Sequence, residues 1–469
     1  MSLRWGAAAV VTVGLMGGLL PAGPAAAVHG AVPGDFNGDG YRDAVLPAPG
    51  ANVSGKEAAG AVVVLYGSSS GLSASRRKTI TQNTSGVPGT AEAYDRFGAS
   101  TATADLNRDG YADLVVSSPY EDTSKGNDSG TVTVLWGSRS GLTSGTNLPT
   151  PSGRPGFYGL DVAALSTGAG TRTRVVVAGW DASVHFTGPF SRSGTFGSAT
   201  LNENTPSLES VALGDFNKDA VPDPAVVTSR LSGLSGGQIY TKPAYGSELK
   251  HGNGLIAATG DLNGDGYTDL VAGDPDEPEV AGVDGATGGR VLVWYGSAHG
   301  ITNDTKPVRI TQSTTGVPGA SEKGDAFGGS LAVADLNRDG LADIVIGSPY
   351  EDLAKRRAGQ VTIVPGRRTG TLGIGAYSFS QDTAGVPGAS ETDDFFGTTV
   401  SAGDINKDGR PELFVGAAGE NNSTGAVWVF PGGTSRPTAT GSRLFTASSV
   451  GLTQDHGTLL GGNGLLWVI

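Results

Sequence analysis

The sequence predicts an all-β protein, a β-propeller of seven blades, and three observations support this prediction. A nine-residue pattern rich in Asp, Asn and Gly recurs six times along the chain. Short runs of alternating or β-branched apolar residues flank each copy. The chain also has 77 glycines but only 7% aromatic residues, which suits many short strands joined by tight turns.

The first 27 residues have the features of a signal peptide. Arg4 precedes an apolar stretch over residues 6–20, and three alanines at 25–27 are the small residues that a signal peptidase recognises. A membrane anchor is the alternative, but the stretch is short and rich in Gly and Ala, whereas a span needs ~20 apolar residues. We therefore expect cleavage after Ala27, a secreted protein and no membrane span.

Residues 28–469 are expected to form one large modular domain, because no linker or charge run divides them. The chain has no cysteine, so an exported protein of this kind needs other means of stabilisation, and metal ions are one candidate. The net charge of −13 argues against a nucleic-acid partner, which requires clustered Lys and Arg. We expect a monomer.

The repeated pattern is D-x-N-x-D-G-x-x-D, and its six copies start at residues 35, 105, 215, 261, 335 and 404. The widest interval, between the second and third copies, has room for one more unit. Residues 175–179 align there with residues 114–118, so this unit keeps its strand. Its four ligand positions have lost their acidic and amide side chains, and are Ser166, Gly168, Gly170 and Arg174.

Each unit contains segments for four short strands, which is typical of a propeller blade. The first follows a Phe-Gly or similar step, as in residues 97–104, and the second is a β-branched run, as in residues 344–346. The third opens at a glycine, as in residues 130–136, and the fourth is short, as in residues 78–82. No helical period is sustained in the mature chain, so almost no helix is expected.

The repeated loop has the donor set that calcium prefers, namely six to eight hard oxygen ligands. Side chains at positions 1, 3, 5 and 9 and the carbonyl at position 7 can converge on one ion, while the glycine at position 6 permits the turn. About six Ca²⁺ ions are expected, mainly as structural cofactors. The predicted metal ligands are Asp35, Asn37, Asp39, Asp43, Asp105, Asn107, Asp109, Asp113, Asp215, Asn217, Asp219, Asp223, Asp261, Asn263, Asp265, Asp269, Asp335, Asn337, Asp339, Asp343, Asp404, Asn406, Asp408 and Glu412.

Two other interpretations of the loop fit its residues less well. An Asp/Asn/Gly β-turn without an ion would leave three carboxylates per loop to repel one another, six times over. An EF-hand-like loop needs an acidic residue at position 12. That position is apolar in all six copies: Leu46, Val116, Val226, Ala272, Ile346 and Val415. Ala220 replaces the glycine of position 6 in the copy starting at residue 215, so we expect the weakest site there.

The chain resembles the FG-GAP repeat family, the propeller unit of integrin α-subunits. The motifs that carry the resemblance are the six loops, the Phe-Gly steps at 97–98, 327–328 and 396–397, and the short segments at 118–119, 347–349 and 416–418. The resemblance implies that the loops join the first two strands of each blade on one face, and that ligands engage the opposite face. Residues 157–159 depart from the pattern, and the unit starting at 215 lacks the step.

Two sets of loops are then expected on the ligand face: residues 119–122, 274–277 and 349–352 in one, and 87–89, 317–319 and 386–388 in the other. Tyrosine beside carboxylates could bind a sugar or a basic peptide, and the candidate partner-binding residues are Tyr120, Glu121, Asp122, Tyr350, Glu351 and Asp352. The alternative is that Pro-Tyr packs between neighbouring blades. The sequence therefore predicts a module that binds an extracellular protein or glycan, and leaves the ligand and the choice between adhesion and glycan binding open.

An extracellular hydrolase, esterase-like or glycosidase-like, is the main alternative function. Residues 67–71 and 233–237 match G-x-S-x-G, but a nucleophile elbow needs a strand-to-helix turn. The five histidines do not recur in the repeat, and the paired carboxylates are assigned to ions. The Lys-Gly-Asp tripeptide at 323–325 is a local variant of the repeat. We therefore expect no enzyme activity. Residues 464–469 look like a strand that could close the ring against the first blade.

Overall fold

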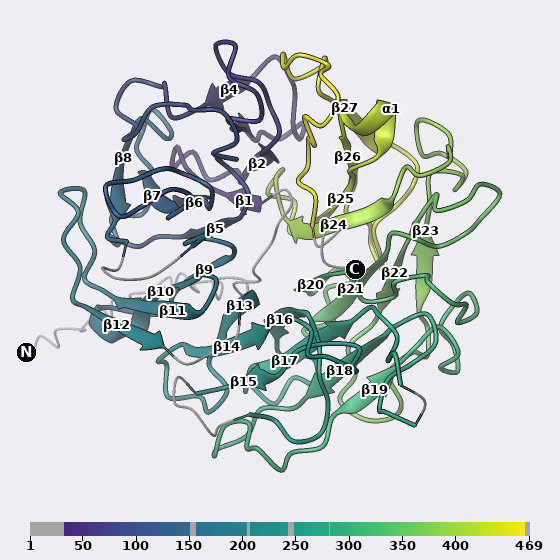
Figure 1. Cartoon of the computed structure of the whole chain (residues 1–469). Helices are drawn as coiled ribbons and strands as arrows, with labels where there is room; N and C mark the ends of the chain where they lie inside the picture. Colours follow the sequence, from purple (N-terminus) through teal and green to yellow (C-terminus); the bar gives the residue numbers. More distant parts are fainter. Residues whose placement is uncertain (1–31, 151–155, 204–206, 243–247, 281, 465–469) are drawn as a thin grey trace, which may run out of the picture.

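The computed structural model describes residues 32–150, 156–203, 207–242, 248–280 and 282–464. Within these residues the chain forms seven antiparallel sheets, arranged as blades around a central axis (Figure 1). The blades follow one another around the ring in chain order, so the last blade lies beside the first. The prediction of an all-β, seven-bladed propeller is confirmed. The predicted signal peptide lies outside the described residues.

Each sheet is contiguous in sequence and is ordered from the axis outward. The first three blades are β1 (Val32–Gly34), β2 (Asp43–Ala48), β3 (Ala61–Leu65) and β4 (Arg77–Ile80); β5 (Thr101–Ala104), β6 (Asp113–Ser118), β7 (Thr131–Trp136) and β8 (Ser144–Leu148); and β9 (Val162–Ser166), β10 (Thr173–Ala178), β11 (Ala182–Thr187) and β12 (Ser198–Glu203). The fourth and fifth are β13 (Leu208–Gly214), β14 (Asp223–Thr228) and β15 (Ile239–Tyr240); and β16 (Ile256–Gly260), β17 (Asp269–Asp274), β18 (Arg290–Trp294) and β19 (Val308–Ile310). The last two are β20 (Ser330–Ala334), β21 (Asp343–Ser348), β22 (Gln360–Val364) and β23 (Tyr377–Phe379); and β24 (Phe396–Gly403), β25 (Glu412–Ala417), β26 (Ala426–Phe430) and β27 (Arg443–Thr446).

Helix is almost absent from the described residues, as predicted. There is one 3₁₀ turn, η1 (Gly170–Arg172), and one four-residue turn, α1 (Glu420–Ser423), in which Asn421 and Asn422 have left-handed backbone angles. In the described part of the chain, no helix has the length and apolar character needed to cross a membrane.

In the residues that the structure describes, the fourth blade differs from the predicted four strands per repeat. Among the described residues its sheet has three strands, β13 to β15. A single bridge between Tyr240 and Glu248 and one hydrogen bond, from Leu249 N–H to Ile239 O (2.8 Å), mark where an outer strand would run. Residues 243–247, which follow β15 in the chain, lie outside the described residues.

The inner strands are buried on both sides, which explains their nearly continuous apolar runs. All six residues of β2, β6, β17, β21 and β25 are buried. The outer strands alternate instead, since one side of them meets solvent: β4 and β19 each bury only their last residue. This gradient explains why the second and third strands of each repeat are the clearest in the sequence.

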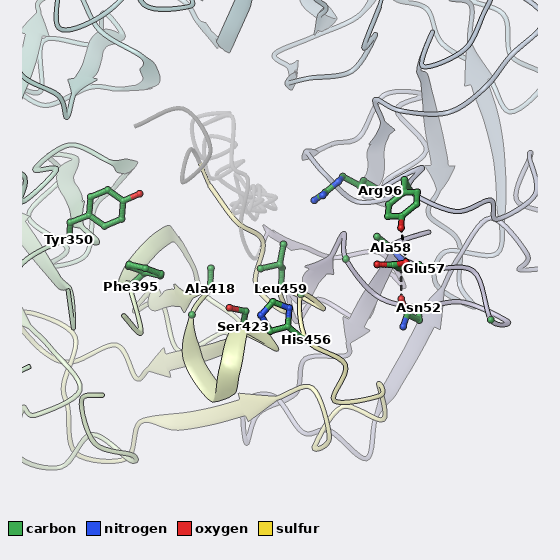
Figure 2. Close-up of a pocket in the computed structure, with 15 residues that line it drawn as sticks. Asn52, Glu57, Ala58, Arg96, Tyr350, Phe395, Ala418, Ser423, His456 and Leu459 are labelled. Carbon is green, nitrogen blue, oxygen red and sulfur yellow. Dashed lines mark hydrogen bonds between the residues drawn. The ribbon is translucent and has the colours of Figure 1, made fainter. Parts of the chain in front are cut away.

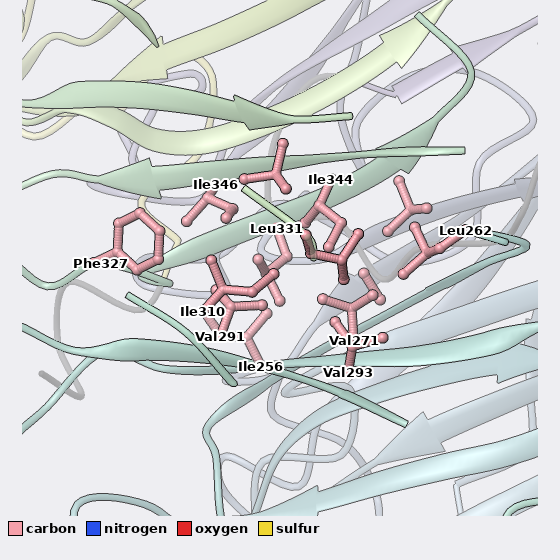
Figure 3. Packing of buried hydrophobic residues seen from close by; sticks show 14 of the residues in the cluster. Ile256, Leu262, Val271, Val291, Val293, Ile310, Phe327, Leu331, Ile344 and Ile346 are labelled. Atoms are coloured by element: carbon pink, nitrogen blue, oxygen red, sulfur yellow. The ribbon is translucent and has the colours of Figure 1, made fainter. Parts of the chain in front are cut away.

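The core is divided among the spaces between neighbouring blades. In the cluster between the fifth and sixth blades, Ile256, Val271 and Val293 pack against Leu331 and Ile344 (Figure 3). Each of these side chains is less than a tenth exposed. Equivalent clusters lie between other pairs of blades, so the stability of each blade depends on its neighbours.

In the three blades that have it, the Phe-Gly step fastens the blade to the one before it. The N–H of Phe97 donates to Ala59 O of the preceding blade (3.0 Å), and the ring of Phe97 is fully buried. Gly60 lies against this backbone with φ of +88°, and a Cβ there would come within 2.3 Å of Phe97 N. Only glycine allows so close an approach. The same contact recurs at Phe327 and Phe396.

The ring is closed by a segment near the C-terminus that imitates this step. The N–H of Leu460 donates to Thr424 O of the seventh blade (2.9 Å), and the N–H of Gly461 donates to Pro47 O of the first blade (2.7 Å). Gly425 meets Leu460 as Gly60 meets Phe97, with a Cβ-to-backbone distance of 2.5 Å. The strand predicted for residues 464–469 falls, apart from Gly464, outside the described residues.

Candidate functional site: the ring of acidic loops and the opposite face

All six acidic loops connect the first strand of a blade to the second. Because every first and second strand pair is antiparallel, these loops emerge at the same end of each sheet, and the connections between second and third strands emerge at the other. The loops therefore share one face of the ring.

The carboxylate at position 1 organises each loop through the backbone. In the first loop, Asp35 Oδ1 accepts the N–H of Gly38 (2.7 Å) and Oδ2 accepts that of Gly40 (2.9 Å). The bond from the N–H at position 6 to the position 1 carboxylate recurs in the other loops, at Asp105, Asp215, Asp261, Asp335 and Asp404 (2.8–3.0 Å). Position 6 has positive φ throughout, including +63° at Ala220, where a Cβ makes this conformation costly.

Positions 3 and 5 complete the turn. The N–H of Asp39 donates to Asn37 Oδ1 (3.0 Å), and the N–H of Tyr41 donates to Asp39 Oδ1 (2.9 Å). Asn37 Nδ2 also lies 3.0 Å from Asp39 Oδ2. In the last two loops the amide of Asn337 or Asn406 turns instead to the position 9 carboxylate. The hydrogen bonds of Asn37 and Asp39 thus bring the position 3 and position 5 oxygens together in the first loop.

The carboxylate at position 9 is buried in five of the six loops, and Asp223 is partly buried. Asp43 is fully buried, and its two oxygens accept the N–H groups of Phe36 (3.1 Å) and Gly67 (2.9 Å). Burial raises the pKa of Asp43 to about 7, and the nearby Asp35 and Asp39 carboxylates also raise it, against the effect of the two donors. Burial likewise raises the pKa to about 7 at Asp113, Asp269, Asp343 and Glu412, and to about 6 at Asp223.

A hard divalent cation fits this donor set. Each carboxylate oxygen of Asp43 accepts one N–H and keeps a second lone pair, and the repulsion among the three carboxylates is the kind that a cation relieves. As the side chains stand, however, no three Asp, Glu or His side chains among the described residues converge closely enough to form a metal site. The loops are held by their own N–H groups.

The third blade has the turn without the acidic side chains. Ser166 Oγ and Thr173 Oγ1 are hydrogen bonded to each other (2.9 Å), and Thr173 Oγ1 donates to Gly168 O (2.8 Å). Hydroxyl-to-backbone bonds thus replace the carboxylates, and the sheet below is intact.

On the opposite face, the two predicted tyrosines contact aromatic residues of the next blade. Tyr120 meets Phe157 edge to face (5.2 Å between ring centroids), and Phe157 meets Trp180 (5.7 Å). Tyr350 meets Phe395 in the same way (5.4 Å). Both tyrosines are half-buried, so each packs between blades and still reaches the surface.

The predicted acidic residues beside these tyrosines differ in exposure. Asp122 and Asp352 are exposed, whereas Glu351 is 9% exposed and accepts a hydrogen bond from Gln312 Nε2 (2.5 Å). Glu121 is held by Gln82 in the same manner. A third pair of this kind joins Gln381 to Glu420 (2.7 Å). Burial raises the pKa of Glu121, Glu351 and Glu420 to about 7.

A hollow of about 550 Å³ lies on this face, between the first and last blades. Figure 2 shows Tyr350 and Phe395 on one side of it and Arg96 and Glu57 on the other, with His456 between them. Tyr94, which is 52% exposed, donates from its hydroxyl to Glu57 Oε2 (2.6 Å) on the same wall. Aromatic faces beside charged groups are typical of ligand sites.

Sequence reasoning missed the residue that precedes each Phe-Gly step. It has positive φ at Arg96, Phe157, Ala326 and Phe395. At Phe157 and Phe395 the side chain contacts a tyrosine of the preceding blade, and Arg96 lies over the Tyr120 ring (5.7 Å). Its variation within an otherwise constant motif, from Arg to Phe to Ala, was the signal available in the sequence.

The two G-x-S-x-G segments lie on turns. Ser69 is exposed, and Ser235 is fully buried, donating to Asp274 Oδ2 (2.8 Å) and accepting from Asn253 Nδ2 (2.9 Å). Neither serine lies on the strand-to-helix turn that an activated nucleophile of this type uses.

Five segments of the chain match the FG-GAP repeat model: residues 27–65, 97–135, 253–294, 327–364 and 396–430. These segments carry the first, second, fifth, sixth and seventh blades. The third and fourth blades, which depart most from the pattern, are not among them.

Curated proteins with similar sequence include integrin α-subunits. Integrin alpha pat-2 of Caenorhabditis briggsae is 32% identical over 227 residues, 46% of this chain and 16% of that protein. Integrin alpha-5 of Xenopus laevis is 32% identical over 223 residues, 45% of this chain and 20% of that protein. Phosphatidylinositol-glycan-specific phospholipase D of Dictyostelium discoideum is 30% identical over 199 residues, 40% of this chain and 20% of that protein. The chain thus matches a fifth or less of the length of these relatives.

A solved structure, that of the exotype rhamnogalacturonan lyase YesX, aligns over 83% of this chain and 70% of that chain, with a TM-score of 0.40 and 13% identity. Each segment that matches the repeat model coincides with one blade of the seven-bladed ring. The chain carries FG-GAP repeats in five of its seven blades, and its sequence is similar to that of integrin α-subunits.

Proposed function

We propose that this protein is a secreted, calcium-stabilised binding module that holds an extracellular protein or glycan on the face opposite the acidic loops. The observation that carries the proposal is the hollow of about 550 Å³ on that face, lined by Tyr94, Tyr350 and Phe395 beside Arg96 and Glu57. Aromatic side chains that reach the surface supply contact area at low entropic cost, and the charged groups beside them supply orientation.

Calcium is proposed as the structural cofactor of the six loops. Its role there would be to neutralise three carboxylates per loop and to fix the turn. In support, every acidic loop combines a buried or partly buried carboxylate of raised pKa with two more carboxylates. The third blade, which lacks these carboxylates, uses neutral hydrogen bonds. These loops bear 18 of the 45 acidic residues of a chain whose net charge is −13.

Binding without catalysis is also a proposal. Its support is that the buried carboxylates are assigned to the loops, and that Ser235 is closed off by Asp274 and Asn253. We further propose export by the first 27 residues. Sequencing the N-terminus of the protein recovered from the growth medium tests this, with Val28 expected as the first residue and an intact N-terminus contradicting it.

The binding role can be tested with arrays of glycans and extracellular proteins, probed with and without calcium. Ligands should be retained by the native chain, and a Tyr94→Ala/Phe395→Ala variant should lose them. Ile374→Ala, which removes a 42% exposed apolar side chain that does not line the hollow, is the matched control and should bind normally. Equal binding by both variants would show that the hollow is not the site.

The calcium role can be tested by isothermal titration of the chelated protein and by metal analysis after dialysis. Uptake of about six ions per chain is expected, and an Asp335→Asn variant, in a loop with glycine at position 6, should reduce the count by one. Arg174→Ala, at the corresponding loop of the third blade, should leave it unchanged. No uptake of calcium would contradict the proposal.

A further inference from the structure

The fifth blade departs from the others at one buried pair of positions. Asp274 and Arg290 face each other across β17 and β18, and their side chains are 0% and 1% exposed. The distance from Arg290 Nε to Asp274 Oδ2 is 2.7 Å. The pairs in the same register of four other blades are Ala48 with Ala61, Ser118 with Thr131, Ser348 with Gln360, and Ala417 with Ala426.

The fold therefore needs no charge at this position. Taking two charges out of water costs several kcal/mol per ion, and replacement of a buried ion pair by neutral residues is often neutral or stabilising. An ion pair that only one of five comparable blades keeps is poorly explained by stability. Its cost points to a use for the guanidinium.

Arg290 forms the floor of a cavity of about 530 Å³ at the junction of the fourth and fifth blades. One side of its guanidinium is fixed by protein groups. Besides the contact with Asp274, its Nη2 donates to Asn253 Oδ1 (2.6 Å), and Asn253 in turn donates to Ser235 Oγ (2.9 Å). Such a network holds the guanidinium in one orientation before any ligand arrives.

The remaining contact of Arg290 is made by an exposed carboxylate. Its Nη1 lies 2.8 Å from Asp284 Oδ2, and the Asp284 side chain is 66% exposed. Asp284 belongs to the connection between β17 and β18, at the mouth of the cavity. The guanidinium of Arg290 therefore accommodates a carboxylate on its solvent side. The carboxylate in that position is that of Asp284, which is carried by a surface loop.

The rim of the cavity is basic although the protein as a whole is acidic. Exposed Lys250, His251, Lys306 and Arg309 line it, and Asp284 is the one acidic residue among the described residues that do so. Lys250 is paired with Asp304 on the outer side (2.9 Å). The other basic side chains favour an anion at the mouth.

We propose that this cavity binds a small ligand through a carboxylate group, which takes the place of Asp284 on Arg290 and is flanked by Lys306 and Arg309. The site is separate from the hollow between the first and last blades and does not depend on the function proposed for it. A uronic acid sugar and a free aliphatic dicarboxylate share this chemistry.

Calorimetric titration of the whole calcium-loaded chain with D-glucuronate, glutarate and neutral D-glucose tests the proposal. We expect D-glucuronate or glutarate to bind and D-glucose not to bind. Binding of both acids shows that the carboxylate alone is recognised, and binding of D-glucuronate alone shows that the sugar ring is read as well. Failure of both acids to bind, in the native chain and in Asp284→Asn, would overturn the proposal.

Three variants locate the site. Asp284→Asn removes the competing carboxylate and should tighten binding about fivefold, whereas Lys306→Ala and Arg309→Ala should each weaken it about threefold. These side chains are exposed, so the variants are expected to fold. Lys355→Ala, which removes an exposed positive charge from the sixth blade, is the control and should change nothing. Equal affinity of all four variants would also overturn the proposal.

Discussion

The Gln312–Glu351 pair predicts a measurable dependence of stability on pH. Glu351 is 9% exposed and lies at the junction of the fifth and sixth blades, where it accepts a hydrogen bond from Gln312 Nε2 (2.5 Å). Burial raises its pKa from 4.5 to about 7, and repulsion by Asp325, Glu322 and Asp352 contributes in the same direction. Glu351 thus binds its proton more tightly in the folded chain than in the unfolded one.

The sign follows from this difference. Between pH 4.5 and about 7 the folded state holds more protons than the unfolded state, so the free energy of unfolding falls as pH rises through this window. For a shift from 4.5 to about 7, linkage gives a loss of about 2 kcal/mol between pH 5 and pH 8 from this one group. The loss is complete once the pH exceeds the folded pKa.

Substitution of Glu351 by Gln removes the titrating group and keeps its shape and its hydrogen bond to Gln312. Urea unfolding at fixed saturating calcium, at pH 5 and at pH 8, should show that Glu351→Gln loses about 2 kcal/mol less than the native chain over this range. Glu203→Gln, at the exposed end of β12, is the control and should leave the pH dependence as it is. Identical pH dependence of Glu351→Gln and the native chain would refute the reasoning.

Three further predictions concern the integrity of the ring. Chelation of calcium should lower the thermal midpoint, and should lower the free energy of unfolding by on the order of 8 kcal/mol for six sites at ~1 mM free ion and a Kd of ~0.1 mM. Scanning calorimetry with and without EDTA checks this, and an unchanged midpoint would contradict a structural role for the ions. Gly359→Ala should destabilise the chain by at least ~2 kcal/mol in urea unfolding, because φ is +85° and the new Cβ would lie 2.2 Å from Phe396 O. The control Gly370→Ala, with φ of +96° and open space around it, should cost about 1 kcal/mol. Equal costs for the two variants would refute the role of the close approach. Truncation after residue 456 should lower the thermal midpoint sharply, because it removes the Leu460 and Gly461 contacts that join the last blade to the first. Truncation after residue 464 keeps these contacts and is the control. Equal midpoints of the two truncated chains would show that this segment does not close the ring.

The sequence was sufficient for the fold because each blade repeats the same local information. The six loops mark the turn between the first and second strands, and the β-branched runs after them are the strands buried on both sides. The outer strands were harder to place, since they are short, half exposed and weakly patterned. The fourth blade shows the limit: it carries the acidic loop of the repeat, but among the described residues its sheet has three strands.

Of the candidate sites, too, one could be predicted from the sequence and the other could not. The acidic loops could be found from sequence because all their donors lie within nine residues. Contacts on the opposite face could not, because they join residues from different blades, as in the 39-residue separation between Gln312 and Glu351. The pairing of Tyr350 with Phe395 likewise depends on how one blade meets the next. Such pairs become visible only when the register between blades is known.

Departures from the repeat are therefore the best guide to function in this protein. What several blades share, such as the Phe-Gly step and its facing glycine, is explained by the assembly of the ring. What one blade has alone needs another explanation, and Arg290 with Asp274 is the clearest case, since other blades place Ala, Ser, Thr or Gln at the same register. The residue before each Phe-Gly step follows the same logic: its backbone is constant, with positive φ, while its side chain changes from Arg96 to Phe395. A constant backbone with a variable side chain lets the chain alter a binding surface without altering the fold.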